Sequence, residues 1–477
     1  MSRVAQVRLG GCLFEAIVDS RRKLTITKNG ELVARGKWKG ARIVDCSAVL
    51  VADDADGAAT AELYSALDSA LERAPARSGK RTRSSATSKI EPAEKNARID
   101  DDSSDFDAID FGGPRPDQEE PDLKVTIRHR SDDLEWTVEV NCILREACKG
   151  LPATTTASVR TENCPKIERW SHSLVSEVGA SAVEEAATRD LQLVESIGEK
   201  LYEATPQLFK DVYWKLAKSG GPLTIQLVCD EPFVPWEFIR PVMSPYLRHP
   251  PLILNHAIAR ISPKYNGFPR RRIPAGDICI VAPKYGKRNG PYRGLPRAQQ
   301  EVAQIVKSFS ARHIPPTRRD VVRFLENNTK ADVRVVHFAG HGDFGHGSSD
   351  AAKIFLNNRG DSLMALEIGR DEIRLGFDCR TFVMLNSCYG ATQTSEPISP
   401  GGWPGAFLRQ GFGGFLGPLK SVGDEAAMRF ATAFYSESLG GNVTIAMALL
   451  NARRALAGKF GDVLIYLFHG DVMSRFE

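Results

Sequence analysis

The chain has 477 residues, of which 42% are hydrophobic, so it is long enough for two or three domains with sizeable cores. Its 63 basic and 59 acidic residues leave a net charge of +4, which is too balanced to predict nucleic-acid binding. Nine cysteines at irregular spacing do not indicate a disulfide framework, and the first residues lack an apolar signal core, so we expect a cytoplasmic protein. No apolar run reaches the ~18 residues of a membrane span, and no membrane partner is expected.

Residues 1–76 are predicted to form a small β-rich docking or recognition domain. Four short runs favour strands, at residues 5–9, 13–18, 23–28 and 32–38. Asn29-Gly30 is typical of a hairpin turn. A helix is expected over residues 60–73, where leucines recur every four residues. No residue in this domain indicates chemistry.

Residues 77–122 are expected to be a disordered linker. Apolar residues become rare there, and the charge changes from basic to acidic along the segment. A tether is the simplest role for such a segment. Because proteolytic nicking concentrates in exposed polar chain, the linker is also a candidate for cleavage.

The rest of the chain is predicted to form two halves, residues 123–270 and residues 271–477. Strands are expected at 123–128, 136–141, 223–229 and 277–282. Helices are expected over 182–217 and 296–308. Strand and helix then alternate, which is typical of an α/β sandwich around a mainly parallel sheet flanked by helices.

Two apolar runs in the second half each end in a reactive side chain. Residues 333–342 read VRVVHFAGHG and residues 381–390 read TFVMLNSCYG, so His341 and Cys388 each follow a buried-strand pattern. Their separation of 47 positions, 388 minus 341, is near the ~50 that separate histidine and cysteine in caspase-type peptidases. Loops at the carboxyl ends of parallel strands form one crevice, so we expect these residues to lie together.

A cysteine and a histidine in this arrangement indicate nucleophilic catalysis. A thiol attacks as its thiolate, and His341 is the candidate base that takes its proton. The backbone N–H groups of Gly342 and Cys388 are the expected oxyanion-hole donors. The sequence therefore predicts a cysteine endopeptidase that cleaves protein substrates without a metal or cofactor.

The cysteine, the histidines and a glycine-rich segment also have simpler interpretations. A lone cysteine after an apolar strand is most often an inert core thiol, and a lone His-Gly pair is most often a turn. His337, His341 and His346 could form a metal site, but no carboxylate or cysteine lies at a ligand spacing beside them. Residues 411–417 read GFGGFLG, a loose dinucleotide-loop pattern that more simply lets a loop pass close to the active-site floor.

A series of segments in chain order carries a family resemblance. The series is Leu201-Tyr202, residues 234–238 (VPWEF), Gly294-Leu295-Pro296 leading into Glu301, residues 337–342, residues 386–390, Phe434-Tyr435 and residues 446–455. Together they resemble a CHAT domain, the caspase-like family of bacterial peptidases related to separase, over about residues 184–469. The resemblance implies a caspase-like sandwich with His341 as general base and Cys388 as nucleophile. It also implies that residues 123–270 are a degenerate half, in which Trp236 fills the core and Glu237 caps or pairs.

Asn386, Trp403 and Asp343 are the predicted substrate-binding residues. Metacaspases and paracaspases carry Asp two residues before the cysteine, whereas this chain has Asn386, so a preference for basic substrates is not implied. The basic loop after residue 282 is either a solvated surface or a contact for an acidic substrate, and the preference stays open. Residues 391–403 are expected to be a mobile loop that lines the groove, with Trp403 as a lid.

The resemblance also implies partners. Family members often act in bacterial defence or cell death, including CRISPR-linked proteolytic cascades, and are switched on by a sensor. Together with the amino-terminal domain and the linker, this motivates a zymogen that a sensor protein or an upstream protease activates. The alternative is a catalytically inactive caspase-like adaptor that binds a sensor. A pseudoenzyme usually loses one member of its dyad, whereas both are present here.

Overall fold

The computed structural model describes a large part of the backbone. The described residues are 3–9, 12–18, 23–28, 31–39, 42–48, 120–130, 133–140, 154–160, 175, 177–178, 186–218, 220–231, 234–264, 271–286, 292–344, 348–358, 360–388, 390, 392, 401–440 and 442–477. Contacts divide the chain into two compact units. One unit comprises Met1–Phe111 with Val242–Arg248, and the other comprises Gly112–Pro241 with His249–Glu477.

The first unit contains a five-stranded antiparallel sheet whose strands follow one another in chain order. They are β1 (Arg3–Leu9), β2 (Cys12–Val18), β3 (Lys23–Lys28), β4 (Glu31–Lys39) and β5 (Arg42–Ala48). The unit also holds the short hairpin of β10 (Val242–Ser244) and β11 (Leu247–Arg248). Four of these strands match predicted runs, whereas β5 was not predicted. The helix expected over residues 60–73 lies outside the described residues, as does most of the predicted linker.

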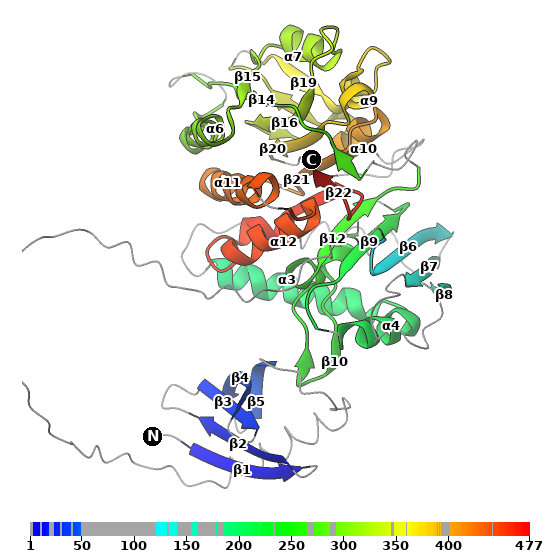
Figure 1. Cartoon of the computed structure of the whole chain (residues 1–477), viewed down its shortest axis with the longest axis vertical. Helices are drawn as coiled ribbons and strands as arrows, with labels where there is room; N and C mark the ends of the chain where they lie inside the picture. Colours follow the sequence, from blue (N-terminus) through cyan, green and yellow to red (C-terminus); the bar gives the residue numbers. More distant parts are fainter. Residues whose placement is uncertain are drawn as a thin grey trace, which may run out of the picture. The chain divides into compact units, whose positions relative to one another are not determined.

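The second unit is built on an eleven-stranded sheet (Figure 1). Across the sheet the strands are β15 (Arg312–His313), β14 (Asp277–Val281), β16 (Val333–Ala339), β20 (Phe382–Asn386), β21 (Gly414–Pro418), β22 (Tyr466–Gly470), β12 (Ala257–Ile261), β9 (Thr224–Cys229), β6 (Leu123–Arg130), β7 (Asp133–Val140) and β8 (Thr154–Arg160). Neighbouring strands are parallel except at β21–β22, β6–β7 and β7–β8. The prediction of an α/β fold around a mainly parallel sheet is confirmed.

Helices and small sheets surround this large sheet. The helices are α3 (Ala186–Glu203), α4 (Gln207–Ala217), α5 (Leu252–Asn255), α6 (Pro296–Phe309), α7 (Arg318–Leu325), α8 (Ala365–Ile368), α9 (Leu375–Cys379), α10 (Gly402–Arg409), α11 (Asp424–Gly440) and α12 (Ile445–Leu456), with 3-10 turns η2 (Trp236–Phe238), η3 (Ser349–Ala351) and η4 (Gly461–Ile465). A three-stranded sheet joins β17 (Gly342–Asp343), β18 (Lys353–Phe355) and β19 (Ser362–Met364), and β13 (Arg272–Ile273) pairs with β23 (Arg475–Phe476).

The helices cover both faces of the sheet because the buried strands are apolar on both sides. Successive side chains of a strand point to opposite faces. In β16 the ring of His337 contacts Tyr435 of α11, and the next ring, Phe338, contacts Phe407 of α10. Helices α11 and α10 therefore lie on opposite faces, as Figure 1 also shows.

The helical stretch expected over residues 182–217 is two helices rather than one. Helix α3 ends at Glu203, and α4 begins at Gln207 after Pro206, whose φ is −66° and ψ is 151°. A proline has no N–H to donate to the preceding turn, so the chain leaves the helical conformation there and starts again. The prediction of a single stretch was wrong at this break.

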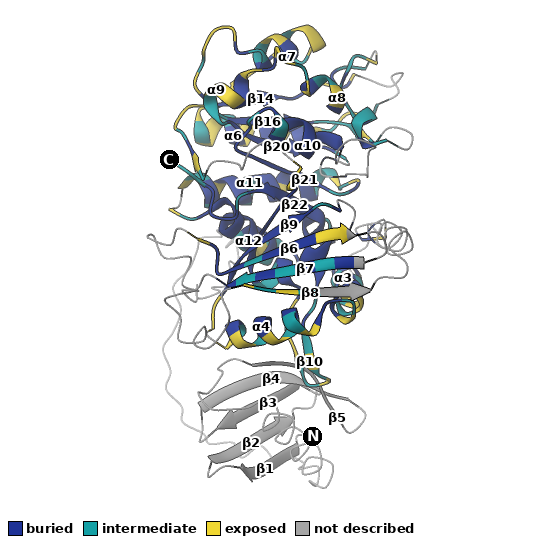
Figure 2. Ribbon diagram, turned by 90° about the vertical axis from the view of Figure 1, so that its right-hand side faces the viewer, coloured by how far each residue is buried: buried dark blue, intermediate teal, exposed yellow. Residues whose placement is uncertain are grey.

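Strand β22 joins the two predicted halves into one sheet. It pairs antiparallel with β21 and parallel with β12, where Arg260 lies opposite His469. Every residue of β20, β21, β22 and β12 is buried, and Figure 2 shows the centre of the sheet as buried. No helix within the described residues combines the length and hydropathy needed to cross a bilayer.

Candidate functional site

His341 and Cys388 lie just beyond the ends of two neighbouring strands. β16 and β20 are parallel, with Ala339 opposite Asn386. Each reactive residue follows two positions after its strand's member of that pair, so both lie at the same edge of the sheet. A Cβ atom built on Gly342 would lie 2.6 Å from the backbone oxygen of Cys388, so the two backbones are in contact there. Only a glycine leaves room for this approach.

The imidazole of His341 is held by a backbone carbonyl. Its Nε2 atom lies 2.8 Å from the carbonyl oxygen of Arg293, in the loop before α6. A carbonyl oxygen only accepts hydrogen bonds, so Nε2 carries the hydrogen. In the neutral ring Nδ1 is then the unprotonated nitrogen, which makes Nδ1 the atom that can take a proton.

Tyr285 fixes both the backbone and the ring of His341. Its hydroxyl donates to the carbonyl oxygen of Phe355 at 2.6 Å and accepts from the backbone N–H of His341 at 2.9 Å. Its ring meets the imidazole edge-on, with centroids 4.6 Å apart. Burial raises the pKa of Tyr285, so the hydroxyl stays protonated and can donate.

Tyr285→Phe is expected to lower kcat about 10-fold with little change in KM, because it keeps the ring but removes the hydroxyl that positions His341. Tyr292→Phe is the matched control, since its ring also contacts His341, with centroids 5.5 Å apart, but its hydroxyl does not bond that backbone. Peptide hydrolysis and thermal unfolding measured side by side separate the two roles. An equal effect of both substitutions on kcat would contradict the positioning role of Tyr285.

Cys388 differs from the other cysteines whose side chains are described. Cys229 and Cys279 are buried, and burial raises the pKa of Cys279 to about 11 and that of Cys229 well above its usual value. Burial also raises the pKa of the half-buried Cys379. A neutral thiol is a poor nucleophile. Among these cysteines, Cys388 is half-buried and has a backbone that meets the loop of His341 at Gly342.

A buried polar network lies behind the strand that carries Cys388. Asn386 donates from Nδ2 to Oε1 of Glu301 at 2.8 Å, and the hydroxyl of Tyr466 donates to Oδ1 of Asn386 at 2.5 Å. Nε2 of His337 lies 2.7 Å from the same Glu301 oxygen, and Nδ1 lies 3.0 Å from the hydroxyl of Tyr435. Burial, and then the negative charge of Glu301, raise the pKa of Tyr435 and of Tyr466 well above the usual value. The network ties β16, β20 and β22 to α6 and α11.

Two predicted substrate-binding residues are instead part of the core. Asn386 is 5% exposed, and its Nδ2 also donates to the carbonyl oxygen of Ala427, so its polar atoms are already bonded. Trp403 is 1% exposed and stacks on Phe407 within α10, so it is not a lid. Both predictions were wrong because an amide and an indole near the nucleophile look the same in sequence whether they face in or out. Asp343 is exposed on β17 and remains a prediction.

The structure bears on two alternative interpretations, the metal site at the histidines and the dinucleotide-type loop at residues 411–417. No group of three or more His, Cys, Asp or Glu side chains in the described part of the chain could hold a metal ion. His337, within β16, bonds Tyr435, whereas His341, beyond the end of that strand, bonds the Arg293 carbonyl. His346 lies outside the described residues. Gly414–Pro418 is the buried strand β21, not an active-site loop, and a Cβ atom on Gly414 would lie 2.9 Å from the ring of Phe468.

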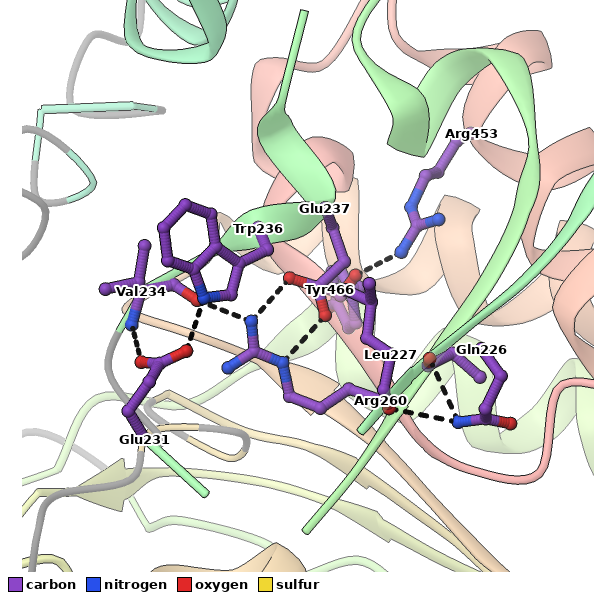
Figure 3. Close-up of polar contacts among 10 residues, drawn as sticks. Gln226, Leu227, Glu231, Val234, Trp236, Glu237, Arg260, Arg453 and Tyr466 are labelled. Atoms are coloured by element: carbon purple, nitrogen blue, oxygen red, sulfur yellow. Dashed lines mark hydrogen bonds and ion pairs between the residues drawn. The ribbon is translucent and has the colours of Figure 1, made fainter. Parts of the chain in front are cut away.

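A second buried cluster lies in the half without the dyad (Figure 3). Arg260 pairs with Glu237, through Nη2 at 2.8 Å and Nε at 2.9 Å. Glu231 accepts from the backbone N–H of Val234 at 3.0 Å and from the indole N–H of Trp236. Trp236 is 1% exposed. The predictions that Trp236 fills the core and that Glu237 is paired are confirmed, so this cluster has a structural role.

The stability of the protein is expected to fall as the pH rises from about 4.5 to about 7, because burial raises the pKa of Glu231 to about 7. Its protonated form is favoured in the folded state, so the contribution is complete below the unfolded pKa and is lost as the pH passes the folded pKa. Glu231→Gln should remove about 2 to 3 kcal/mol of this pH dependence. Thermal unfolding of both proteins at pH 5 and pH 8 measures the difference. Parallel pH profiles would contradict the assignment.

The sequence and the structure were compared with known proteins. Residues 233–462 match the family model of the CHAT domain. No curated protein matches the chain. The structure is similar to the Saccharomyces cerevisiae separase in complex with securin, with a TM-score of 0.44 and 13% identity over 74% of this chain and 30% of that one. The chain therefore spans about 30% of the length of that separase chain.

Two further structures are also similar; one is a cysteine proteinase and the other is a complex of two domains. The Arg-specific cysteine proteinase gingipain R matches with a TM-score of 0.38 and 10% identity, over 65% of this chain and 76% of that one. The complex of Porphyromonas gingivalis RgpB pro- and mature domains matches with a TM-score of 0.36 and 10% identity, over 66% of this chain and 78% of that one.

Proposed function

The chain carries a CHAT domain over residues 233–462, and on this premise we propose that it is a cysteine endopeptidase with Cys388 as nucleophile and His341 as general base. The observation that carries the proposal is the parallel pairing of β16 and β20, because His341 and Cys388 each lie two residues beyond its last pair, Ala339 and Asn386. The Arg293 carbonyl adds to it, because it holds the hydrogen on Nε2 and leaves Nδ1 as the base.

The proposed reaction is acyl transfer through a thioester. Nδ1 of His341 takes the thiol proton, and the sulfur of Cys388 bonds to the carbonyl carbon of the scissile peptide. The protonated imidazole then gives this proton to the leaving nitrogen as the C–N bond breaks. Water, with His341 again acting as base, hydrolyses the thioester and restores the thiol. The backbone N–H groups of Gly342 and Cys388 are the proposed donors to the carbonyl oxygen that becomes negative.

The first test compares new amino termini in a bacterial lysate treated with the wild-type protein or with Cys388→Ala. Cuts that appear only with the wild type support a peptidase and reveal the residue before the cut. The substituted protein is a suitable control because Cys388 lies after the end of β20 and is half-buried, so a shorter side chain there leaves the strand unchanged. An identical set of termini, both without and with a candidate activating protease added to the two lysates, would contradict peptidase activity and favour the alternative, a caspase-like adaptor that binds a sensor or partner protein.

We also propose that the peptidase is a regulated zymogen that an upstream protease or a sensor protein activates, as in bacterial defence. The support is the change from basic to acidic charge along residues 77–122, a segment that includes the boundary between the two compact units at Phe111 and Gly112. Deleting residues 77–119 is expected to allow peptide hydrolysis without any activator. The wild-type chain is expected to hydrolyse peptides only when an activator is present. Equal hydrolysis by both proteins, with and without a candidate activating protease, would contradict this regulation.

A further inference from the structure

A small hollow borders the dyad at the edge of the large sheet. Its lining residues come from the ends of three strands and from β18; they are Val281, Pro283, Phe338, Ala339, Gly340, His341, Ile354, Phe355, Leu356 and Ser387. Its free interior of about 10 Å³ is the space of roughly one water molecule. Because His341 lies in its wall and Ser387 directly precedes Cys388, the hollow lies beside the dyad.

Ser387 is the polar side chain in this wall apart from His341. The residue is 3% exposed, and its hydroxyl oxygen has no hydrogen-bond partner among the described residues. A Cβ atom on Gly342 would lie 3.0 Å from that oxygen, so the hydroxyl lies at the contact between the two catalytic loops. Buried hydroxyl groups are nearly always bonded in native proteins, and an exception at a reactive site points to a missing ligand or water.

The lining and the volume of the hollow exclude charged side chains and large side chains. Its lining contains no Arg, Lys, Asp or Glu side chain. An Arg, Lys, Asp or Glu side chain placed there would lose its hydration without gaining a partner of opposite charge. A space of roughly one water molecule fits a methyl or hydroxymethyl group but not a leucine side chain.

We propose that this hollow binds the side chain of the substrate residue whose carbonyl carbon Cys388 attacks, and that it takes alanine or serine. The Cα atom of that residue is bonded to the attacked carbon, so its side chain must lie within a few bonds of the sulfur. Ser387 is then a specificity-determining residue, and its hydroxyl bonds a serine side chain. This inference rests on the proposed peptidase function.

The test is the rate at which peptidyl ketones, each with a thiol-reactive leaving group, label Cys388 in the full-length protein. The probes share one tail and differ in the residue next to the ketone, which is Gly, Ala, Ser, Leu, Arg or Asp. Intact-mass measurement gives the rate, and His341→Ala defines the labelling that needs the dyad. The Ala and Ser probes are expected to react about 10-fold or more faster than the Leu, Arg and Asp probes.

Two substitutions of Ser387 separate room from hydrogen bonding. Ser387→Val fills the hollow, so the rates of the Ala and Ser probes relative to the Gly probe, which needs no hollow, should each fall about 10-fold. Ser387→Ala should lower the rate of the Ser probe relative to the Ala probe about 3- to 10-fold. Thermal unfolding of the variant proteins shows whether they are folded.

The possible failures are distinguishable. Equal rates for the Ala, Leu and Arg probes on the wild type, or a Ser387→Val protein with unchanged preferences, would overturn the subsite while the peptidase stands. Labelling of Cys388 that does not depend on His341 with any probe would overturn the proposed peptidase and the subsite with it. If a water molecule is the only occupant of the hollow, the Ala, Leu and Arg probes should react at equal rates, which is the first of these results.

Discussion

Cys388→Ala and His341→Ala are each expected to lower kcat/KM for peptide hydrolysis by about 10³-fold or more, and the double variant is expected to lose no more than either single one. The two residues act as one unit, because the thiolate forms only when the imidazole takes the thiol proton. Once either is gone, the other has no remaining role. The measurement is kcat/KM on a peptide taken from a cut found in the lysate.

Matched controls exist for both substitutions. Cys379 is a half-buried thiol at the end of α9, and His313 is an exposed imidazole on β15, so Cys379→Ala and His313→Ala test thiols and imidazoles in general. Neither should change kcat/KM by more than about 2-fold. Additive losses in the double variant, the sum of the two single losses in free energy, would show that His341 and Cys388 act independently and would contradict the dyad.

Asn386→Asp is expected to destabilise the fold by about 3 kcal/mol or more at neutral pH, although it only replaces the side-chain NH2 group by an oxygen. The amide that donates to Glu301 at 2.8 Å becomes a carboxylate beside a carboxylate in a buried site. Burial and the charge of Glu301 raise the pKa of the new carboxyl in the folded state. The loss is therefore absent below the unfolded pKa of ~3.9 and grows as the pH rises above it. Thermal unfolding relative to the wild type from pH 4 to pH 8 measures this.

The double variant Glu301→Gln with Asn386→Asp is the matched partner of this experiment. It restores one amide and one carboxylate in exchanged positions, so it should recover part of the lost stability at pH 7. A loss that is independent of pH, or that the exchange does not reduce, would show that repulsion between the two carboxylates is not its cause. An undiminished stability of Asn386→Asp would contradict the buried network itself.

The strands around the site could be predicted because their chemistry is local. The apolar runs that end at His341 and Cys388 are long enough to mark buried strands, and β16 and β20 lie where those runs predicted them. Their pairing followed from the general behaviour of parallel sheets. Strand β8 could not be predicted in this way. Its sequence, TTTASVR, has only two apolar residues, and it becomes a strand by pairing with β7 at the edge of the sheet.

The residues that position His341 could not be predicted because they act through groups that sequence does not distinguish. Arg293 contributes its main-chain carbonyl, which every residue has. Tyr285 contributes a hydroxyl bonded to two main-chain groups 56 and 70 positions away. The burial of Asn386 depends on Glu301 and Tyr466, which reach it from α6 and β22. Contacts of this kind exist only once the sheet has formed.

Strand β22 lies at the centre of the large sheet but is synthesised after the other strands of that sheet, so the sheet is completed late in biosynthesis. Residues 466–470 leave the ribosome after every other strand of the large sheet, yet they lie between β21 and β12 at its centre. Until they arrive, the nascent chain holds two separate groups of strands, and Asn386 lacks the hydroxyl of Tyr466. The support behind Cys388 is therefore completed only after the polypeptide has been synthesised through this strand, so an unfinished chain emerging from the ribosome does not yet have the finished site.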